Sequence, residues 1–339
     1  MTPTFGARPI RGRLAIVVSG AVVMAAGSVL LAPLVGSTSI SLVRALDWSR
    51  PWASNVDAQI FFVARLPRVL AAAMVGSALA AAGVVFQALL RNPLATPFTL
   101  GVSAGSALGA MLALTIGGSL AATWAAVPAA SFLGALAAVA VVYVMAAARQ
   151  RGFSTSVLLL AGVTLNSLLS ALILLVQYFA DMTRALQTVR WLLGDLDVAS
   201  YRPLVFALPM LALSYAAFVA LAPALNLLSL GGDLAAARGV RVVAVERAAF
   251  FSASLATGAA VSVGGPIGFI GIVVPHLVRL VVGPDNRLVV PASLGFGAAF
   301  LVACDVVART VLSPLELPVG IVTALIGGPF FLWLLVRNA

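Results

Sequence analysis

Residues 61–90 read FFVARLPRVLAAAMVGSALAAAGVVFQALL, a stretch in which positions 69–90 carry no charged side chain. The hydrocarbon core of a bilayer is about 30 Å thick, and a helix needs about 20 apolar residues to cross it. The stretch therefore predicts a membrane-spanning helix, with Arg65 and Arg68 at its first end.

The composition extends this prediction to the whole chain. Of its 339 residues 62% are hydrophobic and only 9% are charged, and the mean hydropathy is +1.14. Soluble domains carry about 25% charged residues. We predict an all-α, polytopic membrane protein whose single permease domain covers residues 1–339. Ten apolar windows predict its spans: 14–35, 69–90, 99–118, 124–148, 156–179, 203–224, 248–264, 267–282, 289–311 and 319–336.

Residue counts exclude several kinds of chemistry. All 20 basic residues are arginine, and the phosphate-binding motif GxxxxGK[ST] requires a lysine. With one cysteine, Cys304, and one histidine, His276, the chain cannot build a multi-ligand zinc, haem or iron–sulfur site from these side chains. We expect no catalytic residue, no metal site and no bound cofactor, so a partner or an ion gradient must supply the energy for transport.

The distribution of arginine predicts the orientation. With the N-terminus in the cytoplasm, ten spans return the C-terminus to the same side, and twelve arginines lie inside against eight outside. This agrees with the positive-inside rule. Arg65, Arg68 and Arg309 then face outward, where they either extend toward lipid headgroups or bind a partner. Asp305 lies one helical turn before Arg309, a spacing that predicts an ion pair within one helix.

Small and polar residues recur at helical spacing on several predicted helices. Gly162, Asn166 and Ser170 form one stripe, and Gly76, Gly83 and Gln87 lie on another. Such stripes allow helices to pack closely. The amide groups of Asn166 and Gln87 need a partner or water in the membrane, so a water-accessible pathway is the alternative interpretation.

Glycine and proline interrupt the apolar pattern at residues 92–101, 264–271 and 313–320. Broken membrane helices leave free backbone groups, which are tolerated only in buried or solvated surroundings. The most polar inner connection, residues 225–247, contains a short predicted helix that Gly239 ends. A structured inner segment on a chain without its own ATP site suggests a docking partner.

Five segments together resemble one known family. They are RLPRVLAAAMVGSALAAAGVVFQALLRNPLATPFTLGVSAGSALGA (65–110), LLLAGVTLNSLLSALI (158–173), LNLLSLGGDLAAARGV (225–240), GPIGFIGIVVPHLVRLVVGPDNR (265–287) and DVVARTVLSPLELPVGIVTALIGGPFFLWLL (305–335). In this order they resemble the iron-siderophore, haem and vitamin B12 permeases of bacterial ABC importers.

The resemblance implies a type II ABC importer permease fold with both termini cytoplasmic, in the bacterial inner membrane. It implies a homodimer in contact with membrane lipid, a cytoplasmic ABC ATPase dimer that binds ATP and Mg, and a periplasmic substrate-binding protein. Nucleic acid is not an expected partner. By matched position, Arg65, Arg68 and Arg309 would receive glutamates of the binding protein. The segment that couples to the ATPase would include Gly231, Gly232, Asp233, Arg238, Gly239 and Val240.

The scarcity of histidine and cysteine argues against bare metal ions as cargo, because such ions need strong ligands along their route. Residues 184–201 are most similar to the haem branch of the family, so we expect haem, with ferric siderophore and vitamin B12 as alternatives. Arg184 and Arg190 either contact haem propionates or belong to a lid without cargo contact. The expected pathway comprises these two arginines with Gln87, Gly162, Asn166 and Ser170. An ion-gradient-driven secondary transporter is the alternative from another class.

Overall fold

The computed structural model describes residues 10–49, 51–116, 125–147, 155–198 and 200–338, and the regular elements in these ranges are all helices. Within them, seven segments are long and apolar enough to cross a membrane, and three shorter apolar helices accompany them. Together they match the ten predicted spans. These helices are α1 (Ile10–Leu31), α4 (Leu66–Leu89), α5 (Val102–Ile116), α6 (Ala126–Ala147), α7 (Thr155–Tyr178), α9 (Arg202–Ser229), α11 (Val242–Gly264), α12 (Ile270–Val282), α13 (Asn286–Thr310) and α14 (Val319–Asn338).

Helix α4 lies at the centre of the bundle. In the segment that contains α4, Val56–Leu89, 83% of the residues of the most apolar stretch are buried. In the segment that contains α1, Ile10–Leu34, only 6% are buried. Glycines permit this burial: a Cβ atom added to Gly76 would lie 2.2 Å from the carbonyl oxygen of Gly297, and one added to Gly83 would lie 2.1 Å from that of Gly271. The stripe on α4 therefore brings the backbones of α13 and α12 into close contact with it.

The helix that carries Arg65 and Arg68 begins earlier than the sequence predicted. Helix α3 (Val56–Gln59), the π-helical turn η3 (Ile60–Arg65) and α4 form one continuous segment. Pro67 has no backbone N–H group, and its ring crowds the carbonyl four residues earlier. A π-helical turn directly before a proline accommodates this conflict. The two arginines consequently lie on a helix and not in a linker.

Irregular backbone occurs at the three Gly/Pro segments, as predicted. Between α11 and α12 the chain turns through Gly265 and Phe269, whose φ angles are +67° and +68°. Residues 97–100 form a short helix, η4 (Pro97–Leu100), which Thr96 and Thr99 stabilise through a reciprocal capping box. The third break separates α13 from α14.

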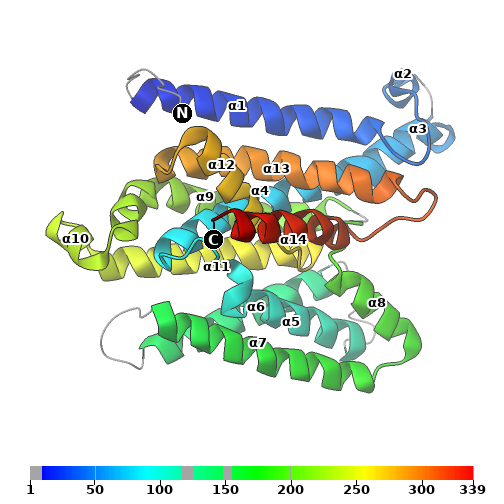
Figure 1. The fold of residues 1–339 in the computed structure, drawn as a ribbon. Coiled ribbons are helices and arrows are strands. Elements are labelled where there is room, and N and C mark those ends of the chain that lie inside the picture. Colours follow the sequence, from blue (N-terminus) through cyan, green and yellow to red (C-terminus); the bar gives the residue numbers. More distant parts are fainter. Residues whose placement is uncertain (1–9, 50, 117–124, 148–154, 199, 339) are drawn as a thin grey trace.

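Figure 1 distinguishes the two ends of the bundle. Helices α2 (Leu42–Ala45), α3 and α8 (Met182–Leu192) lie at one end, which we call the outer end. Helix α10 (Gly232–Ala237) lies at the opposite, inner end, and both labelled chain ends are in that half of the picture. Helix α1 lies along one side of the bundle against α13, with Ala21 as its buried residue.

Candidate functional site

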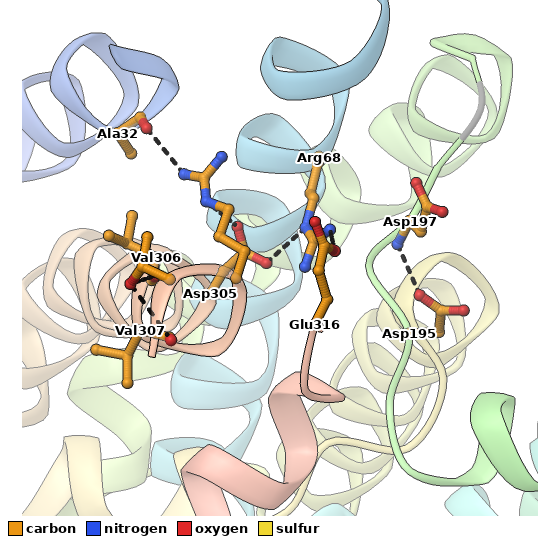
Figure 2. A network of polar contacts seen from close by, with 10 residues as sticks. Ala32, Arg68, Asp195, Asp197, Asp305, Val306, Val307 and Glu316 are labelled. Carbon is orange, nitrogen blue, oxygen red and sulfur yellow. Dashed lines mark hydrogen bonds and ion pairs between the residues drawn. The ribbon is translucent and has the colours of Figure 1, made fainter. Parts of the chain in front are cut away.

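Two arginines converge on the carboxylate of Asp305 at the outer end, and Figure 2 shows one of them, Arg68, beside it. Arg68 of α4 donates from Nε to Oδ1 of Asp305 at 2.7 Å, and Nε of Arg309 lies 3.6 Å from Oδ2 of the same carboxylate. Arg68 also pairs with Glu316, in the connection between α13 and α14. With Arg65, these residues form what we call the outer arginine cluster, which holds three positive and two negative side chains. The predicted docking residues thus lie close together.

Arg65 and Arg309 hold the segment that follows α1. Arg65 donates from Nη1 to the carbonyl oxygen of Pro33 at 2.9 Å and from Nη2 to that of Thr38. Arg309 donates from Nη2 to the carbonyl oxygen of Ala32 at 2.8 Å. These bonds compensate for the removal of two guanidinium groups from water, which would otherwise be costly. The outer arginine cluster therefore also joins α1 to the bundle.

The three arginines differ in how far they are buried. Arg65 and Arg309 are only 7% and 4% exposed, whereas the Glu316 side chain is 47% exposed. Arg68 and Glu316 thus form the solvent edge of the cluster. The predicted pair of Asp305 with Arg309 is present, but Arg68 on another helix is the closer partner. Among the described residues, Nη1 of Arg309 has no hydrogen-bond partner.

The predicted pathway residues divide into two groups. Gln87 is buried, donates to the carbonyl oxygen of Gly271 at 3.0 Å and accepts from Arg279. A Cβ atom added to Gly162 would lie 2.2 Å from the carbonyl oxygen of Thr99. Both positions therefore serve helix packing within the subunit, and their place on a transport pathway stays a prediction.

The other pathway positions have more open surroundings. Asn166 is half-buried and donates to the carbonyl oxygen of Phe98 at 2.8 Å, which ties α7 to η4. Ser170 is exposed on α7, and Arg190 is exposed on α8 at the outer end. Arg184 lies on α8 as well, but its side chain is outside the described part of the chain. The amide of Asn166 thus has the partner that the sequence required, whereas Ser170 and Arg190 remain accessible.

The predicted coupling segment forms a short helix at the inner end. Helix α10 begins at Gly232 and is followed by Gly239, whose φ angle is +82°. The amide of Val240 donates to the carbonyl oxygen of Ala235 at 3.0 Å and closes the helix, as the sequence predicted. Gly231 and Gly232 are half-buried, whereas Asp233 and Arg238 are exposed, as is Leu234 on the same helix. The segment therefore forms a firmly terminated helix with exposed side chains, and its contact with an ATPase stays a prediction.

A polar cluster at the start of α13 was not predicted. Asp285 caps α13 and accepts from Nδ2 of Asn226 at 2.6 Å and from Nη2 of Arg287 at 2.7 Å. The oxygen of the Asn226 amide accepts from the backbone N–H of Asn286 at 2.8 Å. Hydrogen bonds from Arg287 hold the pKa of Asp285 at about 2, against the opposing effect of burial. The Asp–Asn pair at 285–286 is a visible helix-start signal, but nothing in the sequence identifies Asn226 as its partner.

This arrangement is that of a polytopic membrane permease, with a polar cluster at the outer end and a short exposed helix at the inner end. Residues 22–337 match the FecCD transport family. The chain is 44% identical to the cobalamin import permease BtuC of Halobacterium salinarum, over 80% of this chain and 72% of that protein. It is 39% identical to the hemin transport permease HmuU of Yersinia pestis, over 81% and 82%.

A solved structure agrees with the sequence relationship. It is of an ABC transporter assigned to the metal-chelate type, in an inward-facing conformation, and is 31% identical with a TM-score of 0.83. The similarity covers 95% of this chain and 99% of that one. The chain belongs to the FecCD transport family. It is the permease subunit of an ABC importer, a class that works with an ATPase and a substrate-binding protein.

Proposed function

We propose that this chain forms a homodimer in the bacterial inner membrane and imports haem from the periplasm, with ATP hydrolysis in the partner ATPase. The observation that supports a pathway between two copies is a row of exposed hydroxyl groups on α7. Thr164, Ser167 and Ser170 are exposed at spacings of three residues along this helix. Polar groups on a membrane helix usually face a bundle interior or a water-filled cavity, so we infer that a second copy faces α7.

Accessibility to a water-soluble thiol reagent tests this pathway. Cys304 is buried, which keeps the background low in the natural chain. In the reconstituted complex, Ser170→Cys should react with a charged maleimide, and Leu208→Cys, an exposed apolar position on α9, should not. Equal protection of both cysteines in every nucleotide state would contradict the proposal.

The haem proposal draws on the chemistry of the outer end and on the family. Relatives are named for hemin and cobalamin transport, so a large metal chelate is the shared class of cargo. Among the described residues there is no group of three His, Cys, Asp or Glu side chains that could hold a metal ion. The exposed guanidinium group of Arg190 suits a propionate carboxylate.

Transport by the purified complex in proteoliposomes would separate the cargoes. We expect uptake of haem that requires ATP, with less uptake of a ferric siderophore or vitamin B12. Arg190→Glu should lower haem uptake more than the uptake of an uncharged chelate. Uptake that persists without ATP and stops on addition of an uncoupler would instead support a secondary transporter.

Docking of the binding protein is proposed to begin at Arg68. Its pair with the half-exposed Glu316 lies at the solvent edge, so an incoming glutamate can replace Glu316 without first exposing a buried charge. Arg65 and Arg309 then act by holding residues 32–38 beneath the docking surface, and they reach a partner carboxylate only after that segment moves. The unsatisfied Nη1 of Arg309 is one donor such a carboxylate could take.

A binding assay with matched variants tests this order of events. Arg68→Glu should reduce association of the binding protein at least tenfold, because it places like charges in contact. Glu316→Gln should strengthen association by removing the competing carboxylate. Arg44→Glu, at an exposed outer arginine paired with Asp57, is the control and should change association little. Normal association of the Arg68→Glu variant would contradict the docking proposal while leaving the cargo proposal intact.

A further inference from the structure

An apolar groove separates α1 from α12 and α13. It has a volume of about 570 Å³ and is lined by Val17, Gly20 and Met24 of α1, Val281 of α12 and Phe296 of α13, among other apolar residues. These residues belong to the membrane-spanning part of the chain, so the groove opens toward lipid or toward another membrane protein.

The groove exists because α1 is held tightly at one point and loosely elsewhere. A Cβ atom added to Gly295 of α13 would lie 2.4 Å from the carbonyl oxygen of Ala21, so the two helices touch there through their backbones. On the adjacent face of α1, a Cβ atom added to Gly20 would have no neighbour within 4 Å. The close contact at Ala21 thus leaves open space between α1 and α12.

One arginine closes the inner end of the groove. Arg13 precedes Val17, Gly20 and Met24 by four, seven and eleven residues, so it lies on the same face of α1. It donates from Nη2 to the carbonyl oxygen of Val282, the last residue of α12, at 3.1 Å. A guanidinium group carries five N–H donors. Arg13 is exposed, so its remaining donors can bind an anion at the groove's mouth.

The length of the groove matches one leaflet of a bilayer. From Arg13 to Met24 the helix rises about 16 Å, at about 1.5 Å per residue. Half of a hydrocarbon core of about 30 Å is about 15 Å. An acyl chain whose headgroup lies at Arg13 would therefore extend along the apolar part of the groove and end near the bilayer midplane.

We propose that this groove binds an anionic phospholipid of the cytoplasmic leaflet, with one acyl chain between α1 and α12 and the phosphate on Arg13. The separation of an apolar lining from a single cationic end is the pattern expected for a phospholipid, because basic sites between membrane helices on the cytoplasmic side bind anionic headgroups. The lipid would fill the space that α1 leaves and hold α1 against the bundle.

Lipid retention by the full-length permease tests the proposal. The protein would be purified in mild detergent, incubated with phosphatidylglycerol or phosphatidylcholine, and examined by native mass spectrometry and thermal unfolding. We expect phosphatidylglycerol to bind in preference to phosphatidylcholine and to raise the unfolding temperature. Arg13→Ala should weaken phosphatidylglycerol binding about fivefold, since a basic residue at an anionic surface contributes about 1 kcal/mol.

Two pairs of variants distinguish binding in this groove from nonspecific attraction of anionic lipid to a positively charged protein. Gly20→Leu fills the groove and should abolish retention, whereas Gly27→Leu, on the same helix with equally open space at its Cβ position, should retain the lipid. Arg11→Ala removes an equal charge from another face of α1 and should change binding less than twofold. Because Leu favours helix over Gly, neither glycine variant should unfold α1.

Three outcomes would overturn the proposal. Equal losses for Arg13→Ala and Arg11→Ala would mean that lipid follows net charge alone. Full retention by Gly20→Leu would place the lipid elsewhere. A disulfide between two copies of a Gly20→Cys variant would show that protein, and not lipid, covers the groove.

Discussion

Replacing Asp305 with asparagine is expected to destabilise the protein by about 3–5 kcal/mol, the range for breaking a buried ion pair from one side. The Asp305 side chain is fully buried, with Arg68 at 2.7 Å and Arg309 at 3.6 Å. At an effective dielectric constant of about 20, two unit charges 3.6 Å apart attract by roughly 4–5 kcal/mol. Asparagine keeps the shape but removes the charge, and its N–H₂ group is a donor where the arginines need an acceptor.

Denaturant unfolding of the reconstituted protein in mixed micelles would measure this loss. The double variant Asp305→Asn with Arg309→Gln also removes one cation that would lack a partner. We therefore expect its loss of unfolding free energy to be about 1–3 kcal/mol smaller than the sum of the losses of the two single variants. Asp197→Asn, at an exposed acid of the same region, is the control and should cost less than about 0.5 kcal/mol. A loss below about 1 kcal/mol for Asp305→Asn would refute the reasoning, because the arginines would then not depend on this carboxylate.

Three further predictions concern the inner end and the centre. The ionised carboxylate of Asp285 stabilises the folded state fully above its ordinary pKa of 3.8, and this contribution is lost as the pH falls toward about 2. In unfolding measured against pH, the stability advantage of the natural chain over Asp285→Asn should therefore shrink across that interval. Gly76→Ala should cost at least about 1–3 kcal/mol by forcing α4 from α13, whereas Gly27→Ala should be neutral or stabilising; equal effects would contradict the packing argument. Leu234→Asp on α10 should reduce copurification of the ATPase, and Leu315→Asp at the outer end should not; an intact complex with the first variant would remove α10 from the interface.

The apolar part of this fold could be predicted from the sequence because its rules are local. The length of an apolar run determines whether a helix can cross the bilayer, and helical spacing brings glycines onto one face. For this reason the ten helices, the packing role of Gly76 and the termination of α10 at Gly239 follow from short stretches of sequence. Even here the start of the helix lies earlier than the apolar run, because a π-helical turn at residues 60–65 leads into α4 ahead of Pro67.

The polar contacts could not be predicted in the same way. The Asp305–Arg309 spacing suggested a self-contained pair, yet the shorter contact comes from Arg68, 237 residues earlier. Arg65 and Arg68 were expected to face outward, toward lipid headgroups or a partner. The Arg65 side chain is instead buried against carbonyl groups that follow α1, whereas Arg68 lies at the solvent edge, where the carboxylates of Asp305 and Glu316 accept from it.

Both polar clusters lie at the ends of α13, and this placement has a physical cause. The middle of α13 packs through small residues such as Gly297, where the backbones of α13 and α4 are in close contact. There is no room for a charged side chain at this contact. At its two ends, Asp285 and Asp305 meet donors that come from other helices, Asn226 of α9 and Arg68 of α4. Helices in a membrane gain little from apolar contact with one another relative to lipid, so specific polar bonds must fix their register. The ends of α13 are where such bonds can form without placing an unpaired charge in hydrocarbon. Through them α13 is joined to α9 at one end and to α4 at the other.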